Sequence, residues 1–371
     1  MRVLFVIPTL GQGGAQRVLV KLANSLAESA TTCKHSVTIA TFASPNVTPH
    51  HVPGKNVQVH YFGTISGSHS SGAGLLRSIK KLRAVVQKCQ PQIVVAFQDI
   101  AIYPTIFSCT GSGAKLVISE RQDTRFYRLA FIRAFLRWAI YRMADKVVVQ
   151  TDIVKQQMPR NVRDRTIIIP NASPDFSTYA NPSKMHEGVY KIISVGRLEY
   201  QKNFSLLIAA SEMAFKNRDD WKLVIYGEGS LKTSLKQQIT ELQLHDKVEL
   251  AGLSSSVYSK LADANLFVFP SRYEGFPNVL AEASGVGLPC IAYKDVSGVE
   301  ELIEHDVNGL LLLTNQRNAL SLASAMESLM NDPHKRDRMG TEGIALASRY
   351  HQDSIFSCWN KLLHSLASSP E

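Results

Sequence analysis

Residues 274–282 read Glu-Gly-Phe-Pro-Asn-Val-Leu-Ala-Glu and directly follow an apolar stretch, Leu266–Ser271. The apolar stretch is typical of a buried parallel strand, and Pro277 suits the first turn of a helix. The sequence therefore predicts a strand that passes into a helix here. In open α/β sheets, ligands bind at the carboxyl ends of the strands. This stretch thus indicates a ligand site in a doubly wound α/β fold.

The same stretch carries two carboxylates, Glu274 in the turn and Glu282 two helical turns further on. Between them, the start of the helix offers free N–H groups and a dipole that favour a phosphate. A ligand with hydroxyl groups at both ends and phosphates between them fits this arrangement. The stretch therefore indicates a nucleotide sugar.

Short apolar runs alternate with helical patterns along the chain, which predicts parallel sheets built from βαβ units. The 371 residues suit two domains of ordinary size. We predict a Rossmann-like domain at 1–170, a linker rich in Pro, Ser and Asn at 171–188, and a second Rossmann-like domain at 189–350. A last helix within 351–371 can cross back to the first domain. Two such domains would form a cleft between their strand ends.

The predicted strands of the first domain are Val3–Ile7, Val37–Phe42, Val57–Phe62, Ile93–Phe97, Lys115–Ser119, Lys146–Gln150 and Thr166–Ile169. Those of the second domain are Lys191–Val195, Lys222–Tyr226, Val248–Ala251, Leu266–Phe269 and Pro289–Ala292. Helices are expected at 14–28, from about 203, from about 230, at 256–262, at 278–285 and at about 352–366.

Charge is unevenly distributed, because residues 1–170 contain 22 Lys and Arg against 7 Asp and Glu, whereas residues 171–371 contain 19 against 24. The basic half fits a membrane surface or a phosphate-bearing substrate, or simply a solvated basic surface. No nucleic-acid recognition motif accompanies the charge, so no nucleic acid is expected. The five cysteines form no Cys-x-x-Cys and favour a reducing cytoplasm. No apolar run reaches the ~18 residues that span a bilayer, so any membrane contact is expected to be peripheral.

A second informative stretch, Gly196–Asn203, reads Gly-Arg-Leu-Glu-Tyr-Gln-Lys-Asn and follows the first strand of the second domain. Arg197 and Lys202 could neutralise a diphosphate leaving group as its bond to carbon breaks. The alternative is a solvated loop in which Arg197 pairs with Glu199. The chain has no Asp-x-Asp, and His50-His51 lacks a third ligand at a recognisable spacing. No metal is therefore expected, and cationic side chains and helix N-termini would carry the charge instead.

Glycine turns follow two further strands, at Gly11–Gly14 and at Gly227–Gly229. Such turns let the backbone approach a ligand and open a helix towards an anion, although an ordinary structural turn explains them as well. A dinucleotide site would need Gly-x-Gly-x-x-Gly and an acid at the end of the second strand. Position 16 is Gln16 and that strand ends Ala-Thr-Phe, which disfavours an NAD-dependent dehydrogenase.

Taken in order, these motifs resemble glycosyltransferase family 4, whose members are retaining enzymes of the GT-B fold. The motifs that carry the resemblance are Gly11–Ala15, Ile169–Asn171, Gly196–Leu198 with Lys202, Gly227–Gly229 and Glu274–Glu282. The resemblance covers nearly the whole chain. It implies a transfer of sugar from a nucleoside diphosphate that retains the anomeric configuration and needs neither a metal nor a cofactor.

The resemblance also implies roles for matching residues. Glu274 would contact the hydroxyls of the donor sugar and form the catalytic set with Arg197 and Lys202, which would bind the diphosphate. Glu282 would contact the ribose, and Leu250 would border the base. The implied donor-binding set is Gly14, Arg197, Lys202, Gly227, Leu250, Gly275, Phe276, Asn278 and Glu282. The implied acceptor side consists of Gly13, Gly14 and Arg121.

Two positions depart from the family pattern. Many relatives carry a His that contacts the donor sugar, and Arg121 stands in its place within Ser119–Asp123. Because Arg cannot act as a general base, its role would be electrostatic or orienting. Val299 stands where Pro is usual, so Glu300 is left out of the predicted site.

Residues 75–86 and 125–142 combine basic and apolar side chains. Residues 125–142 fit an interfacial helix, although a packed helix with snorkelling arginines also fits them. The resemblance, together with these segments, implies a cytoplasmic enzyme, peripheral at the inner face of the cytoplasmic membrane, that transfers a sugar from a UDP-sugar to a glycan or polyprenyl-diphosphate-linked acceptor. Its product would belong to a cell-surface polysaccharide or oligosaccharide, and GDP is the alternative nucleotide. A GT-B nucleotide-sugar epimerase and a non-catalytic nucleotide-sugar or glycan-binding protein are the alternative functions.

Overall fold

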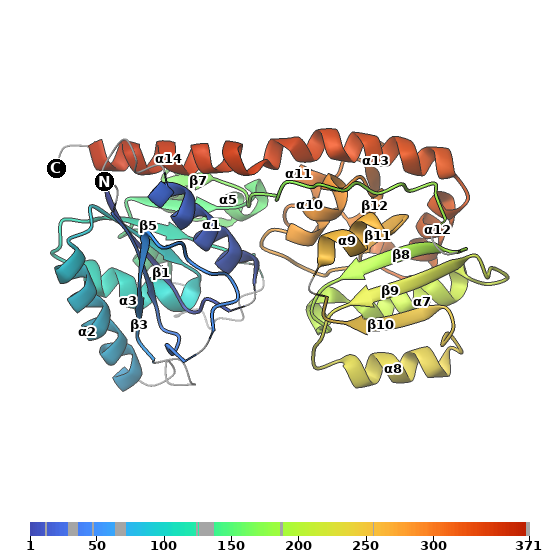
Figure 1. Cartoon of the computed structure of the whole chain (residues 1–371), viewed down its shortest axis with the longest axis horizontal. Helices are drawn as coiled ribbons and strands as arrows, with labels where there is room; N and C mark the ends of the chain where they lie inside the picture. The colour runs from blue at the N-terminus through green and yellow to red at the C-terminus, as the bar shows by residue number, and fades with distance from the viewer. Residues whose placement is uncertain are drawn as a thin grey trace. The chain divides into compact units, whose positions relative to one another are not determined.

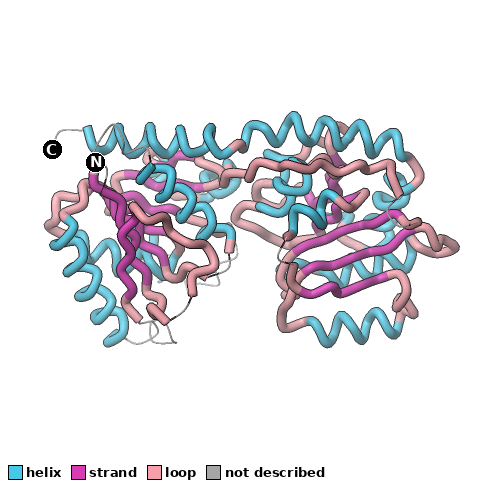
Figure 2. The backbone as a smooth tube through the Cα atoms, in the orientation of Figure 1, coloured by secondary structure: helices cyan, strands magenta, loops and turns pink. Residues whose placement is uncertain are grey.

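The computed structural model describes residues 1–11, 13–28, 36–46, 48–63, 72–123, 125, 137–185, 188–254 and 256–368. The chain forms two compact units, Met1–Ala172 with Asp353–Glu371, and Ser173–Gln352. Each unit is built around one parallel sheet (Figure 1 and Figure 2). The predicted doubly wound α/β class is confirmed.

The first unit contains a seven-stranded sheet in the order β3-β2-β1-β4-β5-β6-β7, and its strand pairs are parallel. The strands are β1 (Arg2–Ile7), β2 (Ser36–Thr41), β3 (Val57–Tyr61), β4 (Ile93–Phe97), β5 (Lys115–Ser119), β6 (Lys146–Val149) and β7 (Thr166–Ile168). The helices are α1 (Gly14–Glu28), α2 (Gly72–Cys89), α3 (Asp99–Cys109), α5 (Asp152–Gln157), α6 (Arg160–Arg163) and α14 (Gln352–Ser368). Strand order reverses between β1 and β4, which is where such folds bind ligands.

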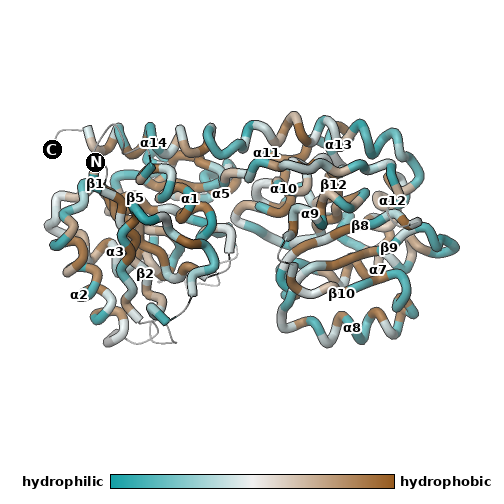
Figure 3. Tube along the Cα trace, viewed as in Figure 1, coloured by the Kyte–Doolittle hydropathy of each residue, from teal (hydrophilic) through white to brown (hydrophobic). Residues whose placement is uncertain are grey.

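Side chains along β1 alternate between two cores, because successive residues of a strand point to opposite faces. Phe5 packs on one face with residues of α1 and α14, and Val6 packs on the other face with residues of α2 and α3. In Figure 3 the strands of the first sheet are largely brown, the colour of hydrophobic residues. The last helix, α14, therefore completes the core of the first unit, where the buried Trp359 stacks on Phe97.

The second unit has a six-stranded parallel sheet in the order β10-β9-β8-β11-β12-β13. Its strands are β8 (Tyr190–Val195), β9 (Trp221–Tyr226), β10 (Val248–Gly252), β11 (Leu266–Phe269), β12 (Cys290–Tyr293) and β13 (Gly309–Leu312). Its α-helices are α7 (Phe204–Ala214), α8 (Lys232–Glu241), α9 (Val257–Ala262), α10 (Asn278–Gly285), α11 (Val299–Leu302), α12 (Ala319–Met330) and α13 (Pro333–Ala347). Its short 3-10 turns are η4 (Tyr200–Lys202), η5 (Thr314–Gln316) and η6 (Ser348–Tyr350).

The structure adds elements that the sequence did not predict, notably β13, α12 and α13. Part of the stretch expected as a linker runs along the second unit, where the Ala180 N–H donates to the Val286 carbonyl at 2.8 Å. Residues 126–136, which make up most of the basic aromatic segment 125–142, lie outside the described residues. Residues 64–71 lie outside them as well.

Candidate active site

Lys202 and Glu274 form an ion pair at the carboxyl edge of the second sheet, with Nζ and Oε1 2.6 Å apart. Lys202 ends η4 in the connection after β8, and Glu274 lies between β11 and α10. Because β8 and β11 are paired neighbours, the two connections leave the sheet side by side. The side chains are only 14% and 11% exposed, so solvent screens this pair less than an ion pair on the surface.

Gln201 donates to the second oxygen of the Glu274 carboxylate. Its side-chain amide donates to the Tyr273 carbonyl at 2.8 Å and to Glu274 Oε2 at 3.1 Å. The Lys202 ammonium also lies 5.3 Å from the ring centroid of Phe269, a cation–π contact. Both oxygens of Glu274 thus accept hydrogen bonds within the chain. Sequence reasoning missed Gln201, whose role depends on which loop faces it.

The alternative to a diphosphate site was a solvated loop in which Arg197 pairs with Glu199. The structure does not show this ion pair. The Glu199 carboxylate instead accepts the backbone N–H and the hydroxyl of Ser230, at 3.0 and 2.8 Å. The backbone hydrogen bond, more than the hydroxyl and the nearby Arg197 charge, lowers the pKa of Glu199. Arg197 is exposed, and its guanidinium donates a long hydrogen bond to the Gln201 amide oxygen, at 3.4 Å. Its guanidinium is therefore accessible to an anion.

The glycine turn after β9 packs against the loop that carries Arg197. A Cβ on Gly227 would lie 1.8 Å from the Gly196 carbonyl oxygen, and one on Gly229 would lie 2.5 Å from the Leu198 carbonyl oxygen. Close approach of the two loops accordingly demands glycine at Gly227, independently of any ligand. The Gly227 N–H donates to the Gly252 carbonyl at 2.8 Å, which places the end of β10, with the half-buried Leu250, beside this turn.

The start of α10 lies next to Glu274. Pro277 is the N-cap residue and provides no side-chain cap, and the helix dipole at this end favours an anion. Asn278 and the buried Glu282 are four residues apart and share one face of α10. Phe276 is buried and packs 5.9 Å from the ring centroid of Tyr350. The Gly275 carbonyl accepts the Ser297 hydroxyl at 3.2 Å.

Gly13, Gly14 and Arg121 belong to the first unit and follow β1 and β5 at the carboxyl edge of its sheet. The Gly13 carbonyl accepts the Arg17 N–H at 3.1 Å in the first turn of α1, while Gln12 lies outside the described residues. Arg121 is buried and donates to Asn171 Oδ1 at 2.7 Å.

Arg121 is held by aromatic rings more than by carboxylates. Its guanidinium carbon lies 4.5 Å from the Phe97 ring centroid and 5.8 Å from that of Trp359. Burial lowers the pKa of Arg121 to about 9, against the opposing effect of Glu120. A buried guanidinium of this kind favours an anionic partner.

Glu120, which sequence reasoning did not single out, pairs with Arg137. One Glu120 oxygen accepts the backbone N–H groups of Arg121 and Gln122, and the other accepts Arg137 and the Tyr141 hydroxyl. Only the folded chain shows which acid each arginine meets.

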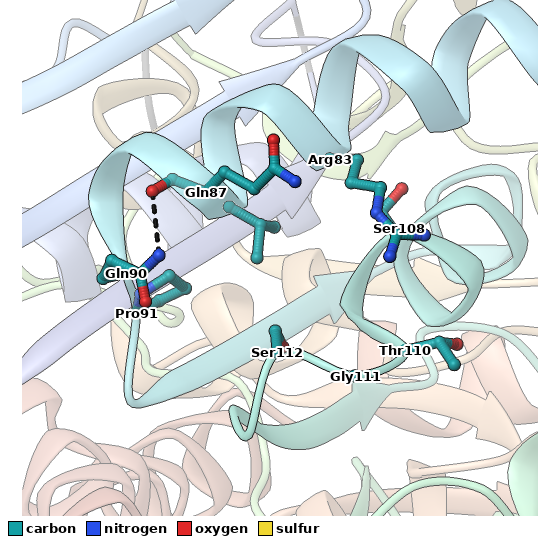
Figure 4. A pocket seen from close by; sticks show the side chains of 9 residues that line it. Arg83, Gln87, Gln90, Pro91, Ser108, Thr110, Gly111 and Ser112 are labelled. Carbon is teal, nitrogen blue, oxygen red and sulfur yellow. Dashed lines mark hydrogen bonds between the residues drawn. The ribbon is translucent and has the colours of Figure 1, made fainter.

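A pocket of the first unit is shown in Figure 4. It is lined by Arg83, Val86, Gln87, Gln90, Pro91, Ser108, Thr110, Gly111 and Ser112. Pro91 and Ser112 precede β4 and β5, so the pocket lies at the amino ends of these strands.

Within the described ranges, His, Cys, Asp and Glu side chains nowhere gather in a group of three that could hold a metal ion. None of the helices described is both long enough and apolar enough to cross a membrane.

Comparison with known proteins identifies the family. Residues 12–173 match the model of Glycosyltransferase Family 4, and residues 175–345 match that of Glycosyl transferases group 1. The chain belongs to the family 4 glycosyltransferases. The resemblance found in its motifs is confirmed, and so is its assignment as an enzyme.

Three relatives illustrate the match of this glycosyltransferase. An uncharacterized glycosyltransferase of Haemophilus influenzae is 24% identical over 97% of the chain and 99% of its own length. The Campylobacter jejuni GalNAc-alpha-(1->4)-GalNAc-alpha-(1->3)-diNAcBac-PP-undecaprenol alpha-1,4-N-acetyl-D-galactosaminyltransferase is 25% identical over 98% of both chains. The crystal structure of Anabaena HepE with UDP and glucose superimposes with a TM-score of 0.78 at 19% identity, covering 98% of this chain and 100% of HepE. The structural likeness confirms the predicted GT-B fold.

Proposed function

We propose that this glycosyltransferase transfers a sugar from a UDP-sugar to a glycan linked to polyprenyl diphosphate, with retention at the anomeric carbon. The observation that carries the proposal is the Lys202–Glu274 pair between the accessible Arg197 and the start of α10. Two relatives support the choice of substrates. HepE was crystallised with UDP and glucose, and the Campylobacter enzyme is named for an acceptor on PP-undecaprenol.

In this proposal the second unit binds the donor. Arg197, Lys202 and the backbone amides around Gly275 and Phe276 surround the diphosphate, and their positive charge stabilises it as the bond to the sugar breaks. Glu274 accepts hydrogen bonds from the sugar hydroxyls once Lys202 turns to the phosphate. These groups supply the charge that a divalent cation provides elsewhere, so we propose that transfer needs no metal and no cofactor.

The nucleoside would lie further along the same edge of the sheet. Glu282 and Asn278, on one face of α10, would contact the ribose, and Leu250 would border the base beside the turn at Gly227. Uracil is proposed because HepE holds UDP, and GDP is the alternative to test.

The first unit would bind the acceptor. Gly13, Gly14 and the buried Arg121 lie at its carboxyl edge, and Arg121 would attract an anionic group of the acceptor or of the donor. Helix α2 has no acidic residue and exposes Arg77, Lys80 and Arg83 to solvent. This basic helix supports a peripheral location at the cytoplasmic face of the membrane, where the enzyme would extend cell-surface or lipid-linked glycans.

The test is a transfer assay with UDP- and GDP-sugars and with sugars linked to a short polyprenyl diphosphate, in the presence and absence of EDTA. Mass spectrometry reads the extension of the acceptor, and NMR reads the anomeric configuration of the new linkage. We expect one donor to give an extended acceptor whose new linkage has the donor's anomeric configuration. Glu274→Gln and Lys202→Met should lower kcat/KM at least about 100-fold. Lys191→Met is the matched control, because its 2.6 Å pair with Asp263 lies at the amino ends of the same two strands.

Other outcomes would change the assignment. A sugar altered from the donor alone, with no acceptor present, would indicate an epimerase. An inverted linkage would overturn retention, and loss of transfer with EDTA that added Mg²⁺ restores would overturn metal independence. Transfer by Glu274→Gln at the wild-type rate would remove the proposed catalytic pair.

A further inference from the structure

Arg272 contacts the loop that carries Lys202 on both sides of that lysine. Its guanidinium donates to Asn203 Oδ1 at 2.7 Å and lies 4.3 Å from the centroid of the Tyr200 ring. Its backbone N–H donates to the Gln201 carbonyl at 2.8 Å. Arg272 therefore contacts Tyr200, Gln201 and Asn203, which flank Lys202.

The contact with Asn203 matters because the backbone of Asn203 has an unusual, left-handed conformation. Asn203 is buried and adopts the left-handed conformation, with φ 56° and ψ 35°, where η4 ends and α7 begins. Residues other than glycine adopt this conformation rarely, although Asn does so more often than most. A hydrogen bond from a charged donor helps to hold the bend. Because Lys202 directly precedes the bend, the direction of its side chain depends on it.

Arg272 is also anchored in the second loop of the pair. It precedes Tyr273 and Glu274, whose carbonyl and carboxylate accept the side-chain amide of Gln201. The arginine thus ties together the two connections, after β8 and after β11, through its backbone as well as its side chain.

We propose that Arg272 is a positioning residue that holds the loop and the bend beside Lys202, so that the Lys202 side chain points to the donor site next to Glu274, and that it affects donor binding only through Lys202. The inference rests on the proposed function, in which Lys202 binds the diphosphate. Arg272 itself does not touch the ligand.

A double-mutant cycle on the full chain tests this, with Arg272→Met and Lys202→Met made singly and together. The Kd values of UDP and GDP are measured by calorimetry, and the melting temperature is measured without ligand. Arg272→Met should weaken binding of the preferred nucleotide about tenfold in the wild-type background, as loss of a hydrogen bond to a charged group does. In the Lys202→Met background it should weaken binding less than about twofold, because the residue it acts through is gone.

Two milder variants keep the test decisive if Arg272→Met fails to fold. Arg272→Lys retains a charged donor but not the planar contact with Tyr200, and it should recover part of the affinity. Asn203→Gly permits the left-handed backbone but removes the acceptor oxygen, and it should weaken nucleotide binding in the same direction. Arg218→Met is the matched control, because Arg218 also donates to an asparagine oxygen at 2.7 Å, that of Asn331, ahead of β9. It should leave both Kd values unchanged.

Equal losses in the two backgrounds would overturn the inference, since they would mean that Arg272 contacts the ligand or acts by another route. Unchanged affinity in Arg272→Met would overturn it as well. Full affinity in Lys202→Met, or no binding of either nucleotide by the wild type, would instead show that the proposed donor site is wrong, and the inference would fail with it.

Discussion

The Lys202 ammonium lies 2.6 Å from the Glu274 carboxylate, although 72 residues separate the two along the chain. Each group satisfies the other. Under the proposed function a nucleotide sugar would offer each a new partner, because its phosphates would attract the ammonium and its hydroxyls would donate to the carboxylate. The pair would then keep both side chains ordered before the donor binds, which would lower the cost of ordering them on binding.

Breaking the pair should destabilise the second unit measurably. In Lys202→Met the Glu274 carboxylate loses a charged donor in a largely buried place, and we expect the free energy of unfolding to fall by about 1–3 kcal/mol. Urea denaturation followed by tryptophan fluorescence, to which the buried Trp221 of the second unit contributes, measures it. In Lys191→Met the loss should stay below about 1 kcal/mol, because 49% of the Asp263 side chain is exposed. Equal losses in both variants would contradict the protection of the Lys202 pair from solvent.

Most of the fold could be predicted because buried parallel strands appear in the sequence as short runs of apolar residues. Strand β13 escaped prediction, since Gly-Leu-Leu-Leu is too short to distinguish strand from helix. The sequence also placed Lys202 and Glu274 at one sheet edge, because both follow predicted strands. It could not show Gln201 bridging to Tyr273, or Arg121 meeting Asn171 50 residues away, because such contacts depend on loop paths that only tertiary packing decides.

Gly227→Ala should lower the free energy of unfolding of the second unit by more than the strain of the positive φ at this position alone. The added Cβ would lie 1.8 Å from the backbone oxygen of Gly196, so the two loops must separate. We expect a loss of about 3 kcal/mol or more in the free energy of unfolding. Gly188→Ala is the control, because Gly188 has φ +81° but nothing within 4 Å of its Cβ position, and it should cost only about 1–2 kcal/mol. Similar losses would show that the loops adapt easily.

Replacing Arg121 and replacing Arg137 should affect the stability of the fold very differently. Arg121→Met keeps an apolar contact with Phe97 and removes a buried charge, so stability should change by less than about 1 kcal/mol or rise. Arg137→Met leaves the buried Glu120 carboxylate without its guanidinium and should cost about 3–5 kcal/mol. Chemical denaturation of the two variants measures both changes. A large loss for Arg121→Met would mean that this arginine mainly supports the fold; unchanged stability with reduced transfer would support a role in substrate binding.

Glu199 should make stability depend on pH in the acid range. Its pKa is lowered in the folded chain by the Ser230 N–H, so the ionised form stabilises the fold above the usual glutamate value and this effect is lost as pH falls through the folded pKa. The wild type should therefore be more stable than Glu199→Gln at neutral pH. The difference should shrink below about pH 4.5, the ordinary value, and vanish in stronger acid. Denaturation curves at several pH values check this, and a difference that ignores pH would contradict it.

Helix α2 provides the test of membrane contact. It exposes Arg77, Lys80 and Arg83, and Leu76 beside them is 61% exposed. Co-sedimentation at low salt should show binding to vesicles rich in phosphatidylglycerol and little binding to phosphatidylcholine, because anionic headgroups attract the basic helix. Salt of about 0.5 M should release the protein, since screening shortens the reach of exposed charges.

The variant Arg77→Gln/Lys80→Gln/Arg83→Gln should lower vesicle binding at least about tenfold, at roughly 1 kcal/mol for each cation near the surface. Its matched control is Lys216→Gln/Lys222→Gln/Lys236→Gln, which removes three exposed lysines from the second unit. That control should bind as the wild type does, because the attraction comes from α2 and not from net charge. Equal losses in the two triple variants would reduce the effect to overall charge, and binding that persists at high salt or on neutral vesicles would rule out the electrostatic mechanism altogether.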